Sequence, residues 1–534
     1  MVYTGATVPI PIGFYGLDGR NNPNEIPPGA LEIAEGIDYE GRIIRKEGGA
    51  EKLDSSGVSG DPICRGLFDW HPVSGTQRLI SAWNDGKIYK EVSDDLDSVT
   101  LKSGINTTEN MQFIEGGEET LGRDRKLFMC NGEDPVQVLD ADGATTSTIS
   151  DPPSDWSGTN QPINMAMHSG PGGTPGGGFM WGFLGHRAYR SKLNDHEDYT
   201  TTPYQLAIGP SVGTQILAGF TFDGIFYLLK DKGIFFIDDS DTDDSNWYPR
   251  LLSSVIGIAS PQAWAFTGND VLVMSRDGTF FLLTAVREKD KTTGNVQAAD
   301  IGKALFLDPW LRDNVNMNKL GLTTATTYPH KSTVEFSVPR KDYGFPNIRL
   351  RFNFEESRVV KFSYSTRDEA YILGIRKDPT AGIEKPIHGD GQGNVYLMDT
   401  EVRSKDSAGY DGIMRTHPTD SGYPDNQKGY DALGIQFDSV AGHNLTITPF
   451  IDGKEGTSRS IEMLGPGDAI DGTAFDLGVS RLAAEGIFTR KTRLSGSGRM
   501  LSIQAKTTGA DEDFKISAIR PMFKAINTFA SARD

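Results

Sequence analysis

A turn-and-strand phrase that recurs along the chain constrains its fold more than any other feature. Each copy places a glycine at a tight turn and follows it with β-branched or aromatic residues, which favour strands. Glycine supplies the positive φ that hairpin turns need. The clear copies are Asp85–Tyr89, Lys232–Phe236, Asp277–Phe281 and Gln392–Tyr396. Weaker relatives surround Gly132, Gly185 and Gly344, so the phrases lie about 45 to 65 residues apart, which is the spacing of four-stranded propeller blades.

The sequence therefore predicts a mainly β protein built around a β-propeller of about six to eight blades. We expect three parts: an irregular N-terminal arm over residues 1–60, the propeller with loop insertions over 61–430, and a C-terminal antiparallel, β-sandwich-like platform domain over 431–534. The length of 534 residues is enough for such a division.

The arm is predicted from its prolines. Asn22–Gly29 contains three of them, and proline lacks an N–H donor and fixes φ. We expect a short helical turn over Leu31–Gly36 and two short strands around a Glu-Gly turn within Ile37–Arg45. Such an arm is suited to lie along a neighbouring subunit, so deletion of residues 1–50 is expected to impair assembly more than folding.

The C-terminal part is predicted from alternation of apolar and polar residues, which marks half-buried strands. It appears in Leu445/Ile447, in Leu501/Ile503/Ala505 and in Phe514/Ile516/Ala518, with a last strand over Phe514–Ile526. Between the repeats, residues 287–320 interrupt the β pattern, and Ala304–Asn314 is expected to form a helix inserted between blades.

Bulk properties narrow the class of function. The formal net charge is −19, which argues against tight binding of nucleic acid through its phosphates. No apolar run is long enough for a membrane span, and no signal peptide is expected. Cys64 and Cys130 lie far apart and are predicted to be ordinary buried thiols, without a disulfide framework or zinc pattern.

Several phrases, in their order along the chain, carry a family resemblance. They are Gly16–Asp18, Asn22–Leu31, Ile37–Gly41 and Arg45–Gly49, then Phe179–Ser191 with Asp198-Tyr199, then Ile256–Pro261 with Gly268–Val271 and Ser275–Gly278. Together they resemble the tail nozzle, or tail tubular, proteins of short-tailed bacteriophages. The resemblance spans roughly residues 16–400 and adds a C-terminal β-domain of the expected kind.

The resemblance implies a structural virion protein without enzymatic activity or cofactor. It implies a β-propeller that assembles as a ring, usually a hexamer, below a head-to-tail adaptor and beside other tail proteins such as fibres. The protein would be made in the host cytoplasm and reside in the virion tail, where double-stranded DNA passes through the channel without specific binding. An acidic bore would let DNA slide, so a net negative bore is predicted.

Two segments resemble ligand loops. Ser169–Gly178 is rich in glycine, but a phosphate-binding loop needs Gly-Lys-Ser/Thr running into a helix, and here Phe179–Trp181 begins a strand. Asp238–Asp244 alternates carboxylates as calcium loops do. Counted from Asp239, the required glycine is replaced by Asp244 and the required glutamate by Arg250, so an EF-hand is rejected. A looser calcium site and a solvated acidic loop both remain open.

Catalytic patterns are incomplete. His186 and His196 flank Asp195 and Asp198, but the second histidine of a zinc-protease helix is missing. Asp300 and Asp308 form an acidic pair of the kind a glycosidase uses, although such pairs arise by chance in an acidic chain. Ser275–Phe280 is similar to the sialidase Asp-box but lacks one spacer residue, which favours a blade turn. The sequence thus assigns no catalytic, cofactor-binding or metal residue.

A basic cluster stands out in the acidic chain. Arg490, Lys491, Arg493 and Arg499 lie in the C-terminal domain, where they could dock an acidic subunit, face DNA or form a solvated strand face. Two other classes of function stay open beside the nozzle. One is a propeller that binds or cleaves glycan with carboxylates and aromatic residues over its central pit. The other is a chromosomally encoded propeller that binds proteins.

Overall fold

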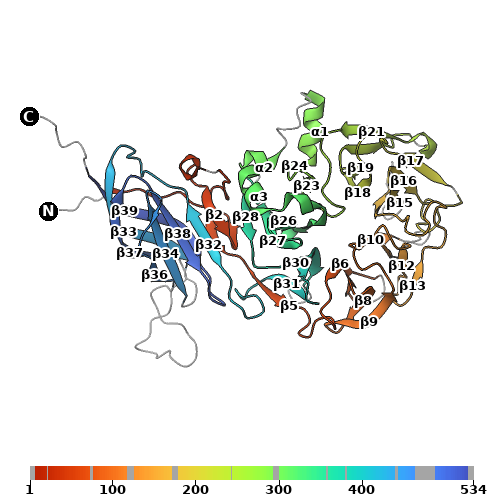
Figure 1. The fold of residues 1–534 in the computed structure, drawn as a ribbon, viewed down its shortest axis with the longest axis horizontal. Coiled ribbons are helices and arrows are strands. Elements are labelled where there is room, and N and C mark those ends of the chain that lie inside the picture. Colours follow the sequence, from red (N-terminus) through yellow and green to blue (C-terminus); the bar gives the residue numbers. More distant parts are fainter. Residues whose placement is uncertain are drawn as a thin grey trace, which may run out of the picture.

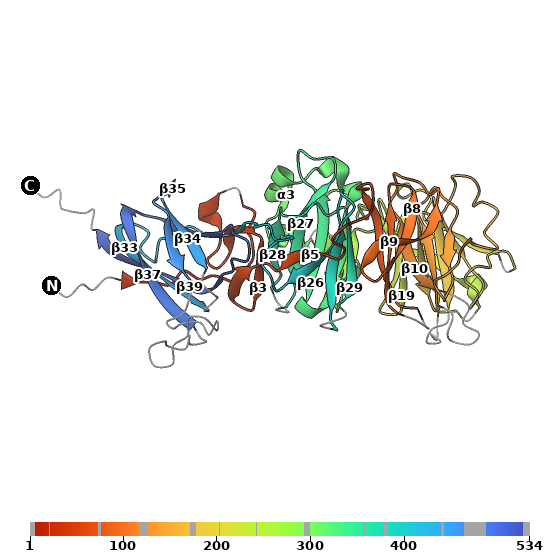
Figure 2. The ribbon, with the colours of Figure 1, turned by 90° about the horizontal axis from the view of Figure 1, so that it is seen from below.

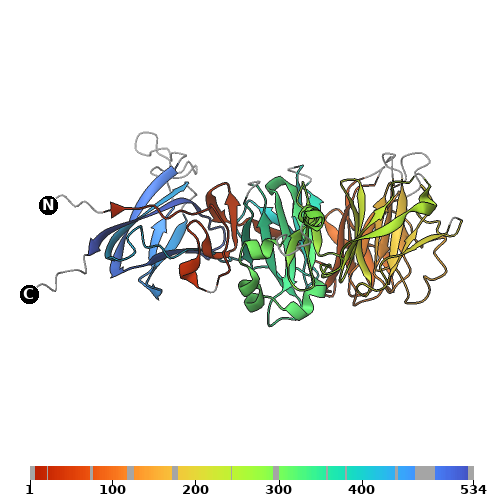
Figure 3. The ribbon, with the colours of Figure 1, turned by 90° about the horizontal axis from the view of Figure 1, so that it is seen from above.

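Strands dominate the molecule, which has two parts in line along its longest axis (Figures 1, 2 and 3). The computed structural model shows a ring of small sheets in one part and, in the other, larger sheets that contain the first and last strands. The structure describes residues 6–20, 22–72, 76–116, 125–170, 178–201, 203–241, 243–292, 300–355, 359–378, 382–438, 443–463 and 487–526.

Within the described residues, four sheets each consist of four consecutive antiparallel strands. Consecutive antiparallel strands need only short hairpin connections, which agrees with the recurring turn phrase. In chain order these sheets are β6 (Cys64–Trp70), β7 (Arg78–Trp83), β8 (Lys87–Val92) and β9 (Asp95–Ser103); β10 (Gln112–Gly116), β11 (Lys126–Cys130), β12 (Gln137–Leu139) and β13 (Thr146–Thr148); β14 (Asn164–His168), β15 (Phe179–Leu184), β16 (Arg187–Arg190) and β17 (Tyr204–Ala207); and β18 (Ile216–Phe222), β19 (Ile225–Lys230), β20 (Ile234–Asp238) and β21 (Tyr248–Ser253).

The next sheets depart from this plan. A three-stranded sheet follows, made of β22 (Trp264–Phe266), β23 (Val271–Met274) and β24 (Phe280–Leu282). Then β25 (Thr324–Tyr328), β26 (Thr333–Pro339), β27 (Pro346–Asn353) and β28 (Lys361–Ser365) form one end of a larger sheet. The last sheet combines β29 (Ile372–Lys377), β30 (Glu384–Gly389) and β31 (Val395–Thr400) with β5 (Gly49–Lys52) from the N-terminal region.

The recurring glycine phrase marks the same hairpin in every one of these sheets, the one between the second and third strands. Gly86, Gly233, Gly278 and Gly393 lie in these turns with φ of +82°, +104°, +85° and +75°. The weaker relatives near Gly132, Gly185 and Gly344 lie in the corresponding turns of three other sheets. The sequence repeat therefore corresponds to a structural repeat.

The first strands of neighbouring sheets contact one another around a central space. β6 contacts β10, β10 contacts β14, and β14 contacts β18, while β22 contacts β25, β25 contacts β29, and β29 contacts β6. Between β18 and β22, the rings of Phe220 and Trp264 stack with centroids 4.3 Å apart. Small sheets arranged in this way are typical of β-propellers. The prediction of a mainly β protein of propeller type is confirmed.

Helices interrupt the sheets where the sequence predicted a break. They are α1 (Leu283–Thr292), α2 (Ile301–Ala304) and α3 (Asp308–Asn314), followed by the 3-10 helix η4 (Met317–Leu322). The single helix expected over Ala304–Asn314 is in fact split, because Phe306 lies between α2 and α3 with φ of +54°. In the part of the chain that the structure describes, no helix combines the length and apolar character needed to cross a membrane.

In the second part of the molecule, the described residues form two sheets, and each sheet combines strands from the N-terminal region with strands from the C-terminal region. One comprises β1 (Ala6–Thr7), β3 (Ile37–Glu40), β4 (Ile43–Lys46), β39 (Lys515–Ile526), β33 (Gln427–Asp438) and β37 (Ile487–Gly498). The other continues from β28 through β2 (Leu31–Glu35), β32 (Gly412–Thr416), β38 (Leu501–Thr507) and β34 (Asn444–Ile451), with β35 (Lys454–Glu455) and β36 (Arg459–Glu462) beside β34. The predicted alternation buries Leu445, Ile447, Leu501, Ile503 and Ala505.

The N-terminal arm differs from its prediction. The proline-rich stretch is irregular apart from the 3-10 turn η1 (Pro23–Glu25), and the expected hairpin is present as β3 and β4. Leu31–Glu35, however, is a strand and not a helical turn, because its backbone pairs with β32. Tertiary hydrogen bonds of this kind override weak local preferences. Since residues 31–52 supply strands to three sheets of their own chain, the expectation that deletion of residues 1–50 mainly affects assembly is not supported.

A buried group of charges joins the arm to the ring. We call this group the charged junction, and the side chain of each member is at most 5% exposed: Glu47, Glu335, Arg349, Arg351, Arg367 and Asp368. The Arg349 guanidinium lies 2.8 Å from both Glu335 and Asp368 and also pairs with Glu47. Burial by itself would raise the pKa of the Glu47 and Asp368 carboxyls, but the neighbouring guanidiniums hold both pKa values below the ordinary range. The arm is thus anchored by paired charges.

Candidate functional site

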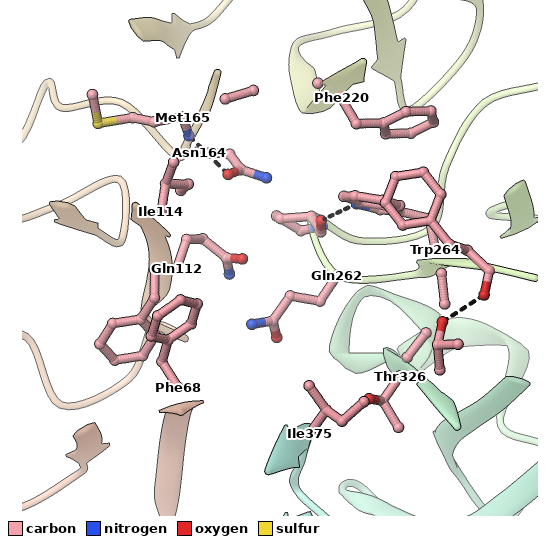
Figure 4. A pocket seen from close by; sticks show the side chains of 18 of the residues that line it. Phe68, Gln112, Ile114, Asn164, Met165, Phe220, Gln262, Trp264, Thr326 and Ile375 are labelled. Carbon is pink, nitrogen blue, oxygen red and sulfur yellow. Dashed lines mark hydrogen bonds between the residues drawn. The ribbon is translucent and has the colours of Figure 1, made fainter. Parts of the chain in front are cut away.

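A hollow lies at the centre of the ring. This central cavity has a volume of about 650 Å³ (Figure 4). The first strands of all the ring sheets line it, namely β6, β10, β14, β18, β22, β25 and β29. Each sheet contributes through side chains on its innermost strand, so the cavity is a direct product of the repeat.

The lining is electrically neutral. Among the residues that the structure describes around this cavity, none is Asp, Glu, Lys, Arg or His. Glycosidic bond cleavage ordinarily needs two carboxyl groups that flank the bond. The central cavity therefore lacks the groups for this chemistry, although it has the shape of a ligand site.

Aromatic side chains form two walls of the cavity. On one wall the rings of Phe68 and Phe113 stack with centroids 5.9 Å apart. On the facing wall, which Figure 4 shows opposite Phe68, Trp264 stacks on Phe220 and meets Phe266 edge-on at 5.4 Å. Phe266 is 41% exposed, so this second wall is accessible. We refer to these groups as the first and second aromatic walls.

Most polar side chains of the lining already bind the protein's own backbone. The hydroxyls of Thr221, Thr326 and Thr327 donate to carbonyl oxygens at 3.1, 3.1 and 2.5 Å. The Asn164 amide donates to the Leu217 carbonyl at 3.2 Å and accepts from a backbone amide at 2.7 Å. These hydrogen bonds hold the inner strands together and use the hydroxyl donors, so the threonines can offer a ligand only acceptor lone pairs.

Gln112 and Gln262 differ from this pattern. The Gln112 side chain is 7% exposed and makes no hydrogen bond to any residue that the structure describes. Gln262 donates through Nε2 to the Met111 carbonyl at 3.5 Å, while its Oε1 is buried without a partner among the described residues. Figure 4 shows the two amides pointing toward each other across the cavity. Of the two, the Gln112 amide has the more unused hydrogen-bonding capacity.

The same two amides separate the central cavity from a smaller one of about 260 Å³. This smaller cavity contains charged side chains, because Glu109, Asp231 and Arg276 line it. Arg276 lies 3.6 Å from the Asp231 carboxylate. Charges are therefore present only beyond the amides among the described lining residues.

The histidines noted in the sequence have structural partners. His196 is buried, and its Nε2 lies 3.2 Å from the Gly178 carbonyl; burial lowers the pKa of His196 to about 4. His186 Nδ1 lies 2.8 Å from the Lys230 ammonium. Neither lines the central cavity. Their contacts favour hydrogen-bonding roles over metal binding.

The described carboxylates of the acidic segment Asp238–Asp244 bind different partners. Asp238 pairs with Arg250, Asp239 lies 2.8 Å from His168, and Asp241 accepts from Asn246 at 3.0 Å. Thr242 and the Asp244 side chain lie outside the described residues. In the described ranges, no three His, Cys, Asp or Glu side chains gather as metal ligands would. These contacts favour the solvated loop over the looser calcium site.

The structure brings the acidic pair together, since the carboxylates of Asp300 and Asp308 both lie beside Gly302, and burial and then the Asp308 charge raise the pKa of Asp300. Asp300 accepts from the Lys303 amide at 3.2 Å and caps α2, Asp308 lies in the first turn of α3, and neither lines the central cavity. Asp277 accepts from the Thr279 amide at 3.2 Å within the turn between β23 and β24, as a blade turn requires. Of Ser169–Gly178, residues 171–177 lie outside the described part, and the strand expected after it is β15.

The basic cluster does not form one surface. Lys491 and Arg493 are exposed on one face of β37, whereas Arg490 points to the other face and lies 3.7 Å from Glu462. Cys64 and Cys130 are free and buried, and burial raises the pKa of both thiols. The prediction of ordinary buried thiols is confirmed. Sequence reasoning missed Gln112 and Gln262, which belong to no recognisable motif.

Comparisons with known proteins found solved structures that are only distantly similar to this chain. No family model and no curated protein matches the chain. Three solved structures share 8–12% identity: the exo-β-1,3-galactanase of Phanerochaete chrysosporium with galactose (10% identity; 89% of this chain and 100% of that one; TM-score 0.30), Raptor of Chaetomium thermophilum (8%; 66% and 29%; 0.37) and YCF48 of Cyanidioschyzon merolae (12%; 66% and 98%; 0.33). With TM-scores below 0.5, these similarities carry no argument about activity, substrate or partner.

Proposed function

We propose that the chain is a structural virion protein that forms a ring-shaped tail nozzle below a head-to-tail adaptor and serves as a conduit for genome ejection. The observation that carries this proposal is the way both ends of the chain hold the propeller. The N-terminal β1 and β4 pair with the C-terminal β39 in one sheet, so the ring of small sheets projects from a base built by both termini. A subunit whose propeller is held in this way is suited to assembly. The arm segments that resemble nozzle proteins contribute strands to that base.

The same proposal includes seven blades. Each sheet that begins at β6, β10, β14, β18, β22, β25 or β29 is one blade, and each contributes to the central cavity. β5 pairs with β31 and closes the ring by joining an N-terminal strand to the last blade. We assign β6 to β31 to the propeller, which therefore ends before the predicted boundary at residue 430, and the strands from β32 onward to a β-sandwich-like platform, with residues 31–52 as strands shared between them.

A structural role is supported by the central cavity, whose described lining residues include no Asp, Glu, Lys, Arg or His. The net charge of −19 supports a conduit rather than a grip on DNA. An acidic bore would repel DNA weakly within a screening length of about 8 Å at physiological salt and leave it free to slide. The partners in this proposal are further copies of the chain in a hexameric ring, the adaptor, other tail proteins such as fibres, and duplex DNA without specific binding.

Single-particle imaging of the purified full chain, alone and with lysate of a phage that encodes it, tests the proposal. We expect rings with a central hole wide enough for duplex DNA, or density for the protein at the tail tip of particles. A stable monomer with no affinity for tail intermediates would contradict the nozzle. A continuous Lys/Arg-lined bore would contradict the sliding argument while leaving the conduit intact.

A second candidate is a propeller-type tail protein that binds glycan. The observation that favours it is the lining of the central cavity, in which aromatic walls meet available amides. The absence of carboxyl groups from that described lining favours binding over cleavage. This candidate predicts measurable binding to cell-surface polysaccharide, and imaging for rings separates it from the nozzle.

A further inference from the structure

We propose that the central cavity is a binding site for a small neutral saccharide, held between the two aromatic walls by the amides of Gln112 and Gln262. This inference deepens the second candidate, glycan binding, and rests on it. It does not depend on whether the chain forms a ring, because the cavity lies within one propeller. The argument uses the cavity's size, its available polar groups, its walls and its lack of charge.

The size of the cavity suits a small ligand. About 650 Å³ lies within the range of roughly 300–1,000 Å³ in which proteins bind small molecules. Such sites are mostly apolar and carry a few well-placed polar groups that fix orientation. The central cavity has this composition, with aromatic and aliphatic side chains around a small number of amides and hydroxyls.

The available polar groups identify what the ligand must offer. The threonine hydroxyls and Asn164 already donate to backbone carbonyls, and Gln262 Oε1 is itself buried, so the unused capacity lies mainly in the Gln112 amide and in the second Nε2 hydrogen of Gln262. A primary amide both donates and accepts, so its best partner is a group that can do both. A hydroxyl does so, and a saccharide presents several hydroxyls on one face. A buried amide without a partner is also unfavourable, so a ligand that pairs it gains affinity.

The aromatic walls supply the second half of the recognition. A pyranose ring has a face of C–H bonds that packs against an aromatic ring and removes apolar area from water. Phe266, on the second aromatic wall, is 41% exposed and can make this contact, while the Phe68–Phe113 pair limits the opposite side. Hydroxyls around the sugar's rim would then face the amides that point into the cavity between these walls (Figure 4).

Neutrality defines the class of sugar. A buried charge without an opposite charge or several hydrogen bonds is strongly unfavourable. No described residue of the lining could neutralise a uronic acid or a sugar phosphate. Among the described residues that line the two cavities, charged side chains line only the smaller cavity, beyond Gln112 and Gln262. The cavity is therefore expected to select neutral sugars over acidic ones.

Calorimetric titration of the full chain tests the site with named probes: galactose, N-acetylglucosamine, lactose and N,N′-diacetylchitobiose, with glucuronic acid as the charged comparison. At least one neutral probe is expected to bind with a millimolar or lower dissociation constant, and more tightly than glucuronic acid. Absence of binding by every neutral probe at about 10 mM would overturn the proposal. So would equal affinity for glucuronic acid.

Amino-acid substitutions test whether the saccharide binds in the central cavity. The double variant Gln112→Leu/Gln262→Leu is expected to weaken affinity about tenfold or more, since each lost hydrogen bond to a neutral group weakens binding roughly threefold to tenfold. Phe266→Leu, at a half-exposed position, is expected to weaken it several-fold without loss of folding. The matched control Gln392→Leu makes the same change in an exposed turn and should leave affinity unchanged. Undiminished binding in the double variant would overturn the site while leaving glycan binding elsewhere on the protein intact.

Discussion

The central cavity and the charged junction lie on neighbouring strands of the run β25–β28, yet their polar groups are paired in different ways. β25 contributes neutral side chains to the cavity, among them Thr326. One and two strands away, Glu335 on β26 and Arg349 on β27 are fully buried and bind each other. The cavity leaves the Gln112 amide without a partner among the described residues, whereas charges in the junction tolerate burial only because each has partners.

Of the changes considered, removal of the arm should have the largest effect on the stability of the protein. Deletion of residues 1–50 removes β1–β4 with all the strand pairings that they make, and it removes Glu47 of the charged junction. We expect loss of cooperative folding, measured by circular dichroism and thermal melting. A truncated chain that melts cooperatively and fails only to assemble would restore the arm to the role expected from sequence.

Replacement of Arg349, the central cation of the charged junction, should have the next largest effect on stability. Arg349→Met leaves Glu47, Glu335 and Asp368 buried without their shared partner, and breaking a buried pair in this way costs about 3–5 kcal/mol of unfolding free energy. Urea denaturation measures it. The control Arg276→Met breaks the partly exposed pair with Asp231 and should cost less than about 1 kcal/mol. Equal costs for the two variants would show that the junction is not the anchor described above.

Acid should weaken the region around the junction through His388. This side chain is fully buried, stacks on Tyr396 with centroids 4.9 Å apart and lies 4.0 Å from Asp368. Burial lowers the pKa of His388 to about 3, below its ordinary value of about 6.5. Between these values the unfolded chain binds a proton that the folded chain does not, so stability falls as pH drops from 6.5 toward 3, by about 1.4 kcal/mol per pH unit.

His388→Phe keeps the stacking on Tyr396 and removes this titration. Urea midpoints from pH 7 to pH 4.5 should therefore fall less steeply in the variant than in the natural chain. His196, whose pKa burial also lowers, to about 4, remains in both proteins and contributes the residual slope. An identical slope in the two proteins would contradict the assignment to His388.

The smallest change in stability is expected at the cavity. Gln112→Leu/Gln262→Leu replaces amides that lack full hydrogen bonding by apolar groups of similar size, and such replacements are nearly neutral. We expect unfolding free energies within about 1 kcal/mol of the natural chain by urea denaturation. A loss comparable to that of Arg349→Met would mean that these amides are structural, and would weaken their assignment to a ligand.

Sequence reasoning succeeded where structure depends on neighbouring residues. The turns at Gly86, Gly233, Gly278 and Gly393 were predictable because a positive φ followed by strand-forming residues is a local signal. It failed at Leu31–Glu35, whose strand depends on pairing with β32 almost 400 residues further on, at Leu31↔Thr416. It also could not single out Gln112 and Gln262, because a glutamine is unremarkable until its surroundings leave it without a partner.

The amino-acid sequence by itself thus determined the β class, the repeating hairpins, the break near residues 287–320 and the buried state of both cysteines. These follow from backbone preference, glycine conformation and side-chain polarity, which act over a few residues. Only the tertiary structure decided how the sheets meet around a neutral cavity, where the arm pairs, and which charges form the junction. Arg349 and Glu47 are 302 residues apart, and no local pattern records a contact that arises only when distant strands pack together.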